Sequence, residues 1–495
     1  MRKLAFFVIF LPFAAAAQAQ IPNADDLLRS RMNTPMLRSE SDLTGEGVCW
    51  HAAYDMNKFM EGYRKTGEQG YLEAAVTYYE ALLDKLYTAP DGYQGWVGPY
   101  IYDENYIGDV HIGDAILFNP MLDFSETILK RSPETLREKY ADKAEKYVSL
   151  AKKHLIEKWD QRGTWHEDGR YGAYVSWDQY MTPDHLDEWR VLDVKNSNLT
   201  LPFNKQNSMG IACLRIYRIT GETFYREKAL KIFNYMKSRM TLFRDHYVWN
   251  YWEPFGPWDI DESQSNSLRH WVNVHPYRNY QAGEIHEIVE AYHSGVTFNK
   301  IDIQRIINTN LKVMWNGDRE NPEWRNSNYA VQMAALGELP IKEAPGGHFP
   351  NLAGTLWTGL ADFSETVREL GGMDRDDPVR FDRKYDHLPV TVLERPFHSN
   401  QSFTMAAAIP AAPTQGETVQ LVTQLRVGGK LSIALYDEDD EAPLQTIRPD
   451  PDEDIHAGVH ITSWDTETIE PGRYRVRWIL NDEIREFPIT INSTP

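Results

Sequence analysis

A repeated pair of helices is the feature that most limits what this chain can fold into. The segments Tyr63–Glu68 and Tyr217–Glu222 both read Tyr-Arg-x-Thr-Gly-Glu, and each is followed by a Tyr and an Ala four residues apart. The glycine suits the left-handed cap that ends a helix, and the next helix starts at once. The repeat therefore predicts a helix hairpin used at least twice. Such hairpins close into a ring or stack as a solenoid.

Apolar residues recur at helical spacing through most of the chain from about 47 to 371. Predicted helices cover 51–64, 71–86, 116–129, 133–159, 208–219, 224–240, 282–292, 301–314 and 352–370. Long segments rich in aromatic and polar residues interrupt them at 88–110, 160–206 and 244–280. We expect these to be loops, and because long ordered loops usually carry function, we expect the site among them.

The pattern changes near Glu394, where Val, Ile and Thr begin to alternate with polar residues. Predicted strands cover 419–427, 430–436, 474–480 and 486–491. The acidic run 437–441 lacks the central glycine of a calcium loop, so we expect a solvated hairpin tip there. The predicted fold is mainly α: an (α/α)n toroid over 20–390, then an antiparallel, immunoglobulin-like β-sandwich over 395–495.

The first 19 residues have the order of a secretory signal. Arg2 and Lys3 precede the apolar run 4–17, and Ala17-Gln18-Ala19 supplies a small-x-small cleavage pattern. The run is shorter than the roughly 20 residues that a bilayer span needs. We therefore expect a secreted or periplasmic protein without a membrane anchor.

The composition limits the classes of molecule that this chain is expected to bind. The formal net charge of −20 argues against nucleic acid, although a local basic cluster would still admit an anionic substrate. Cys49 and Cys213 make no disulfide framework, and we expect two buried free thiols rather than a pair. The chain holds 15 Trp and 27 Tyr, many of them in the predicted loops. Aromatic faces suit the C–H faces of sugar rings, which favours a carbohydrate cleft over a purely structural use of these side chains.

The segment 269–280 is the richest in groups that transfer protons or bind anions. Pro276 favours a helix start, which places two tyrosines three residues apart near a helix N-terminus. The alternative is a well-packed aromatic loop. The candidates are Arg269, His270, His275, Tyr277, Arg278 and Tyr280.

Two further helix starts carry polar residues. The first is the segment 203–212, whose amides could cap a helix or bind a carboxylate. The second, Cys49-Trp50-His51, opens the first core helix, where a lone histidine is more often structural. The substrate-binding candidates are Asn204, Lys205, Gln206, His51, Trp50, Trp96, Trp249, Trp252 and Arg278, and Asn207 is a further catalytic candidate.

Other chemistries find less support. The segment 286–290 resembles a zinc helix, but Glu290 replaces the second His, so we predict no metal site. No Walker loop or Gly-x-Ser-x-Gly elbow is present, and no cofactor is predicted. Carboxylate pairs such as Asp103 with Glu104, or Asp259 with Asp261, could serve a glycosidase.

From about residue 40 to the end, the layout resembles the α/α-toroid polysaccharide lyases. Gln206-Asn207-Ser208 is similar to the Asn-Asn-His-Ser stretch of one alginate lyase family. The segment 276–280 is similar to the His-Tyr-His-Asn-Tyr stretch that holds that family's catalytic tyrosine. Two departures matter: Asn207 stands where that family has His, and Gln206 where it has Asn.

The resemblance implies β-elimination on a uronate polymer such as alginate, glucuronan or ulvan. Tyr277 is then the acid and also a candidate base, with Tyr280 as its competitor. His275 or His270 (His51 less directly) is the base or its helper. Asn207, Gln206 and Arg269 would neutralise the substrate carboxylate. A glycoside hydrolase, a uronate C5-epimerase and a non-catalytic polysaccharide-binding protein remain alternatives.

Overall fold

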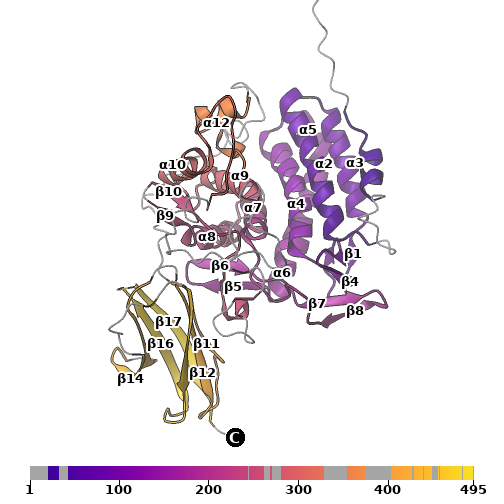
Figure 1. Cartoon of the computed structure of the whole chain (residues 1–495). Coiled ribbons are helices and arrows are strands. Elements are labelled where there is room, and N and C mark those ends of the chain that lie inside the picture. The colour runs from indigo at the N-terminus through magenta and orange to yellow at the C-terminus, as the bar shows by residue number, and fades with distance from the viewer. Residues whose placement is uncertain are drawn as a thin grey trace, which may run out of the picture.

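The computed structural model describes residues 21–32, 43–243, 245–260, 268–269, 272, 280–327, 354–373, 403–425, 428–438, 440–448, 455, 458–481 and 483–493. The predicted signal (1–19) and the predicted domain boundary near 390–395 lie outside these residues. Figure 1 shows a helical N-terminal part followed by a C-terminal part built of strands.

The helices largely follow the predicted segments. They are α1 (Ala24–Met32), α2 (Gly45–Thr66), α3 (Gly70–Leu83), α4 (His111–Glu126), α5 (Glu134–Ala151), α6 (Lys158–Gln161), α7 (Phe203–Thr220), α8 (Thr223–Ser238), α9 (Tyr280–His293), α10 (Lys300–Asn308) and α12 (Glu365–Leu370). π-Helical turns extend three of them: η2 (Thr127–Arg131), η3 (Lys152–Glu157) and η5 (Thr309–Met314).

The two Thr-Gly repeats are helix ends, as predicted. Gly67 ends α2 with φ 73°, and its N–H donates to the carbonyl of Tyr63 at 2.7 Å. Gly221 ends α7 with φ 81° and bonds Tyr217 in the same way. Because L-residues are strained at such φ values, each glycine allows the chain to turn directly into the next helix.

The predicted helix over 352–370 is wrong in its first half. Residues 354–357 have no regular secondary structure, and η6 (Thr358–Leu360) and α12 follow them. The backbone N–H of Gly354 donates to Trp324, and that of Trp357 donates to Asn310. These bonds to a distant segment replace helical ones, and the side chain of Ser364 then caps α12.

The prediction of loops over 88–110 and 160–206 is wrong as well, because these segments form short strands of small antiparallel sheets. Their strands are β1 (Tyr87–Thr88), β2 (Gln94–Gly95), β3 (Gly98–Tyr100), β4 (Asp103–Gly108), β5 (Trp165–Asp168), β6 (Tyr171–Tyr174), β7 (Gln179–Thr182) and β8 (His185–Val191). The order β3-β4-β7-β8 joins the loops, with Ile107 opposite Met181. The third predicted loop, 244–280, follows β9 (Thr241–Phe243) and contains β10 (His246–Val248) and the 3-10 turn η4 (Pro257–Asp259).

The C-terminal part consists of antiparallel strands in two sheets, ordered β11-β12-β15 and β14-β13-β16-β17. The strands are β11 (Phe403–Ile409), β12 (Thr418–Leu425), β13 (Leu431–Asp437), β14 (Pro443–Arg448), β15 (Gly458–Asp465), β16 (Gly472–Leu480) and β17 (Glu483–Ile491). The four predicted strands are present, and the acidic run joins β13 to β14 as predicted. Side chains of both sheets share one core, which includes Leu421 and Trp478.

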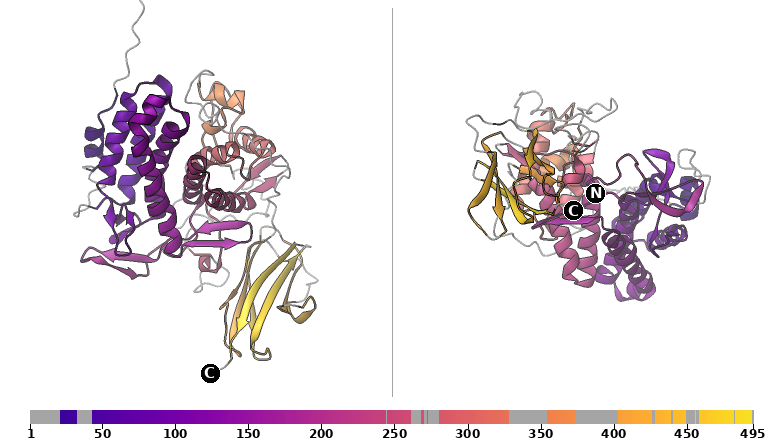
Figure 2. Two further views of the ribbon diagram at one scale, coloured as in Figure 1. Left: turned by 180° about the vertical axis from the view of Figure 1, so that it is seen from behind. Right: turned by 90° about the horizontal axis from the view of Figure 1, so that it is seen from below.

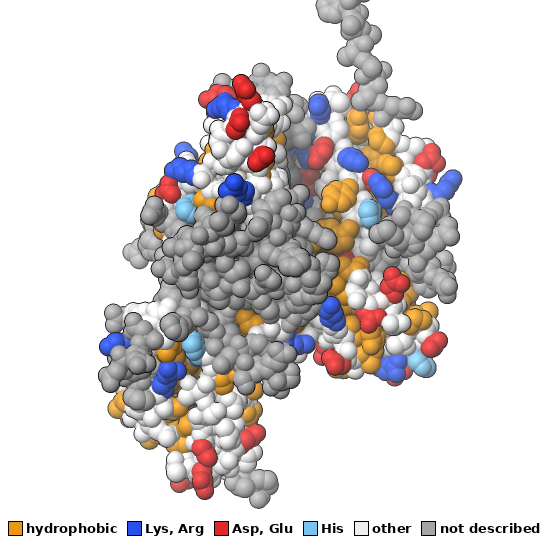
Figure 3. Space-filling model, in the orientation of Figure 1, with side chains coloured by type: hydrophobic (Ala, Val, Ile, Leu, Met, Phe, Trp, Pro, Cys, Tyr) orange, Lys and Arg blue, Asp and Glu red, His pale blue; other side chains and the backbone are white. Residues whose placement is uncertain are grey.

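The C-terminal strands β11–β17 lie at one end of the helical part, beside α8 and the β5–β6 hairpin (Figures 1 and 2). Val422 of β12 packs with Tyr251 and Leu268 of the helical part. On the face in Figure 3, apolar side chains gather over the N-terminal helices and the small sheet below them. Cys49 and Cys213 are buried free thiols, as predicted. Within the described part of the chain, no helix is long and apolar enough to cross a membrane.

Candidate functional site

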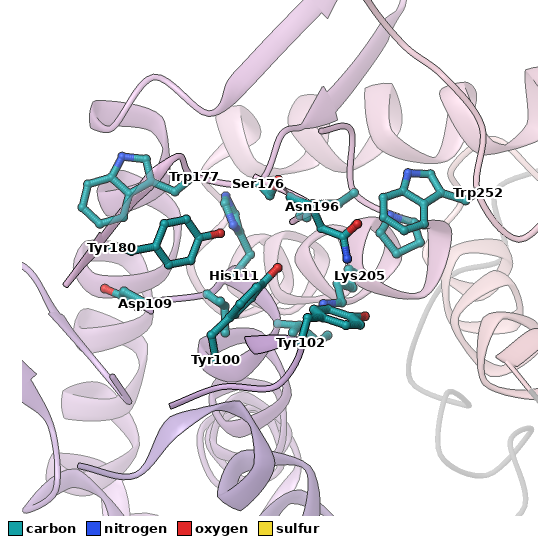
Figure 4. Close-up of a pocket in the computed structure, with 14 residues that line it drawn as sticks. Tyr100, Tyr102, Asp109, His111, Ser176, Trp177, Tyr180, Asn196, Lys205 and Trp252 are labelled. Carbon is teal, nitrogen blue, oxygen red and sulfur yellow. Dashed lines mark hydrogen bonds between the residues drawn. The ribbon is translucent and has the colours of Figure 1, made fainter. Parts of the chain in front are cut away.

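An aromatic pocket lies where the β3-β4-β7-β8 sheet meets the starts of α4 and α7 (Figure 4). Tyr100 and Tyr180 come from strands β3 and β7, and Tyr102 comes from the turn between β3 and β4. His111 is the first residue of α4, and Lys205 lies in the first turn of α7. Loop residues complete the lining, among them Ser176, Trp177, Asn196 and Trp252. The pocket therefore combines aromatic faces with a cation, an imidazole and phenols.

His111 is held rigidly in the floor of this pocket. Its ring stacks on Trp159, with centroids 3.7 Å apart, and its Nε2 lies 2.9 Å from Thr164 Oγ1. Burial lowers the pKa of His111 well below the usual value of 6.5, and the cations Lys158, Arg162 and Lys205 lower it further. The imidazole is therefore neutral at pH 7 and able to accept a proton.

Lys205 brings positive charge to the opposite side of the pocket. Its Nζ is 3.2 Å from Oε1 of Glu46, which also accepts from Nε1 of Trp50 at 3.2 Å. Burial alone would lower the pKa of Lys205, but Glu46 outweighs it, helped by Tyr102 and Tyr280, and the pKa is raised. Lys205 therefore stays charged, and it is the residue best placed here to attract a carboxylate.

The tyrosines form a continuous aromatic cluster. The ring of Tyr100 lies 5.4 Å from that of Tyr102 and 5.2 Å from that of Tyr180. The hydroxyl of Tyr100 donates to the carbonyl of Lys195, whereas Tyr102 is 42% exposed and its ring centroid is 5.8 Å from Nζ of Lys205. Partial burial raises the pKa of Tyr102, which Lys205 opposes in part, so the phenol keeps its proton at neutral pH.

The one carboxylate among the pocket-lining residues of the described chain is already in ion pairs. Asp109 lies 3.0 Å from Nζ of Lys158 and 2.8 Å from Nη1 of Arg162. Lys158 in turn is 2.6 Å from Asp114, whose pKa burial raises to about 7. Because both partners are buried, we assign Asp109 to holding the floor of the pocket rather than to proton transfer.

Several residues predicted from sequence are at or near this pocket. Lys205 and Trp252 line it, and Trp50 donates a hydrogen bond to Glu46, the ion-pair partner of Lys205. Tyr280 is the first residue of α9, stacks on Tyr251 at 4.7 Å, and interacts electrostatically with Lys205 and Tyr102.

Other predicted residues have structural partners instead. Gln206 is fully buried and bonds the backbone N–H and C=O of Tyr174. Trp96 donates to the carbonyl of Leu82 in the core, and His51 is exposed on α2. Arg269 donates to the carbonyls of residues 197, 198 and 258, so its guanidinium ties two loops together. In this conformation none of the four is directed at the pocket.

The remaining predictions divide into buried, exposed and undescribed groups. Asp259 accepts four hydrogen bonds in the core, which suits a structural anchor. Asp103 and Glu104 lie at the tip of the β3–β4 hairpin, with Glu104 exposed. Outside the described residues lie His270, His275, Tyr277, Arg278 and Asp261.

A second polar cluster lies between α7 and α9. Asn207 is fully buried, with Nδ2 3.1 Å from Sδ of Met236. Ser208 donates to Glu287 at 2.8 Å, and Trp249 donates to Glu284 at 2.8 Å. Among the described residues, no hydrogen-bond partner is found for one side-chain oxygen each of Asn204, Asn207, Glu284 and Glu287. Burial raises the pKa of both glutamates, that of Glu284 to about 8. Glu284 is therefore largely protonated at neutral pH.

The pKa of Glu284 leads to a test of this packing. Between about pH 4.5 and 8 the unfolded chain has lost the proton that the folded chain keeps, so the free energy of unfolding falls as pH rises. In the wild type we expect this fall in the free energy of unfolding to be on the order of a few kcal/mol. Glu284→Gln should remove it, because an amide does not titrate. Urea unfolding of both proteins at pH 5 and pH 8 measures the difference. An equal fall in both would contradict the assignment.

Sequence reasoning missed most of the pocket. Tyr100, Tyr102, His111 and Tyr180 were not among the expected site residues, although all lie in or beside two segments expected to carry function. The signal available was three tyrosines within seven residues, 100–106, directly before a helix that starts on His111. In the described part of the chain, no group of three or more His, Cys, Asp and Glu side chains is placed to hold a metal ion.

Comparisons with known proteins leave the chain without a family. No protein-family model matches the sequence, and no curated protein matches it. Among solved structures it is similar to an inactive variant of an α-1,6-mannanase of Salegentibacter sp. HEL1_6, in complex with α-1,6-mannotriose. The identity is 12%, the match covers 74% of this chain and 83% of that chain, and the TM-score is 0.32. A similarity of this size transfers neither fold nor activity.

Proposed function

We propose that this chain is an exported enzyme that cleaves a uronic-acid polysaccharide by β-elimination in the aromatic pocket. One observation carries the proposal. The same pocket holds a histidine whose pKa is lowered, phenols whose pKa values are raised, and a charged lysine. Groups whose pKa values are pushed apart in one site are the expected acid and base of a proton-transfer reaction.

The chemistry explains why a cation is needed. The C5–H of a uronate is barely acidic while the neighbouring carboxylate is ionised. The ammonium of Lys205 would neutralise that carboxylate and stabilise the negative charge that develops on it when the proton leaves. Asn196, which also lines the pocket, offers an amide for the same purpose.

The proton transfers are then assigned to His111 and a tyrosine. Neutral His111 takes the C5 proton, the electron pair forms the C4–C5 double bond, and the C4–O4 bond breaks. The hydroxyl of Tyr102 protonates the leaving O4. Tyr277, chosen from sequence, is the competing acid. The free volume of the pocket is ≈30 Å³, room for one or two waters, so we expect the exposed ring of Tyr102 to rotate when sugar binds.

The acid assignment predicts a large effect of one hydroxyl. Tyr102→Phe should lower kcat about 100-fold, because general acid catalysis contributes roughly 10²–10⁴. Tyr106→Phe is the matched control, since Tyr106 is on the same sheet and packs on Tyr180 but does not line the pocket. The rate of ultraviolet-absorbing product release measures both. Full activity of Tyr102→Phe would transfer the role to Tyr277 or another group.

We also propose that the helix hairpins α2–α3, α4–α5 and α7–α8 form part of an α/α toroid, and that the two C-terminal sheets form an immunoglobulin-like sandwich. The capped hairpins and the shared core of the two sheets support this architecture. In such an arrangement the pocket lies at the starts of α4 and α7, where a polymer could lie across the ends of the helices.

A glycoside hydrolase is the second candidate. The observation that favours it is the raised pKa of Glu284 and Glu287, since a hydrolase needs a carboxylic acid that keeps its proton at neutral pH, as the pKa of about 8 allows Glu284 to do. Incubation with alginate, glucuronan and ulvan separates the two. Elimination produces unsaturated, ultraviolet-absorbing ends, whereas hydrolysis produces new reducing ends without them. Binding to all three polymers without cleavage would contradict both.

A further inference from the structure

The proton positions around His111 follow from the partners of Thr164. Oγ1 of Thr164 lies 2.7 Å from the carbonyl of Trp159 and 2.9 Å from Nε2 of His111. A carbonyl only accepts, so the single hydroxyl proton of Thr164 is donated to Trp159. Toward His111 the same oxygen can therefore only accept, and Nε2 of His111 must carry a hydrogen.

Thr164 has little freedom to adopt another arrangement. It is 4% exposed, its backbone N–H also donates to the carbonyl of Trp159, and its own carbonyl accepts from Val175. The ring of His111 is fixed by its stacking on Trp159, the residue whose carbonyl orients Thr164. His111 also starts α4, where the positive end of a 16-residue helix disfavours a second proton on the ring.

We propose that Thr164 is a positioning residue that selects the Nε2–H tautomer of His111 and so makes Nδ1 the proton-accepting atom of the pocket. Among the described residues none bonds Nδ1, and His111 lines the pocket. The role of Nδ1 as the atom that takes the C5 proton rests on the proposed function. The tautomer itself does not, because it follows from the Thr164 hydrogen bonds alone.

The tautomer is tested by nitrogen NMR of the full chain labelled in its histidine rings at pH 7, with His111→Gln identifying the His111 signals. We expect one neutral form with the hydrogen on Nε2. Thr164→Ser keeps the hydroxyl and should keep this spectrum, whereas Thr164→Val removes the acceptor and should add the Nδ1–H form. An Nδ1–H or doubly protonated His111 in the wild type would overturn the proposal, and this result does not depend on whether Thr164→Val folds.

The positioning role is tested by kinetics on the uronate polymer that the protein cleaves. Thr164→Val should lower kcat about tenfold or more, since a histidine in the wrong tautomer is a poor base, and Thr164→Ser should restore most of it. In the His111→Gln background, Thr164→Val should have no further effect. An equal loss in both backgrounds would make Thr164 merely structural. An Nε2–H tautomer in a protein that cleaves no uronate polymer would refute the proposed function but retain the tautomer.

Discussion

Replacing His111 with glutamine is expected to lower kcat/KM for the uronate polymer by about 10³–10⁴-fold, the upper part of the range for a general base. Glutamine keeps a side-chain N–H for Thr164 but has no basic nitrogen. Substrate binding should change little, because Lys205 and the aromatic residues that line the pocket remain.

His154 provides the matched control. It is also buried, and burial lowers its pKa to about 4, but it accepts from the backbone of Gln94 and does not line the pocket. His154→Gln should therefore keep the wild-type rate if it folds, which circular dichroism and a melting curve would verify. If His111→Gln retains more than about a tenth of the activity, the base is another group, and His275 and His270 become the first choices.

Replacing Lys205 with methionine is expected to have the second largest effect. Removing a preorganised charge at a developing anion costs about 10²–10³ in rate. The same change leaves Glu46, which is 2% exposed, buried without its cation. Loss of one partner of a buried pair destabilises proteins by about 3–5 kcal/mol, so lower stability alone could mimic a catalytic effect.

A double variant separates these two causes. In Glu46→Gln/Lys205→Met the buried carboxylate is gone, while the amide oxygen still accepts from Trp50. Stability should recover toward the wild type, and the loss in rate should remain. Recovery of the wild-type rate by the double variant would mean that Lys205 serves only to pair Glu46, and the proposed neutralisation of the substrate carboxylate would be wrong.

The helix hairpins could be predicted because their signals are local. Each glycine cap lies within three residues of the start of the next helix, as at Gly67 before α3 and Gly221 before α8. Strands β3, β4 and β7 could not be found in this way. Their pairing joins Ile107 to Met181 across a long stretch of sequence, and this pairing brings Tyr100 beside Tyr180.

The polar residues at the start of α7 show which part of the site could not be predicted from the sequence. Lys205 and Gln206 are neighbours in a segment rich in polar side chains. The first turns toward the pocket and the second is used by the backbone of Tyr174. The two side chains point about 100° apart, one residue along the helix. The position of the distant strand β6 decides which of them faces the pocket. The partners of Arg269 could not be predicted for a related reason, because its carbonyl partners belong to other loops.

The fate of water during cleavage tests the central claim most directly. The wild-type protein is incubated with each uronate polymer in ¹⁸O-labelled water, with products reduced at once to stop exchange at the reducing end and analysed by mass spectrometry. β-Elimination adds no water, so the account predicts unsaturated products one water lighter than hydrolysis products and free of ¹⁸O. Saturated fragments that carry one ¹⁸O atom would contradict it and identify a hydrolase.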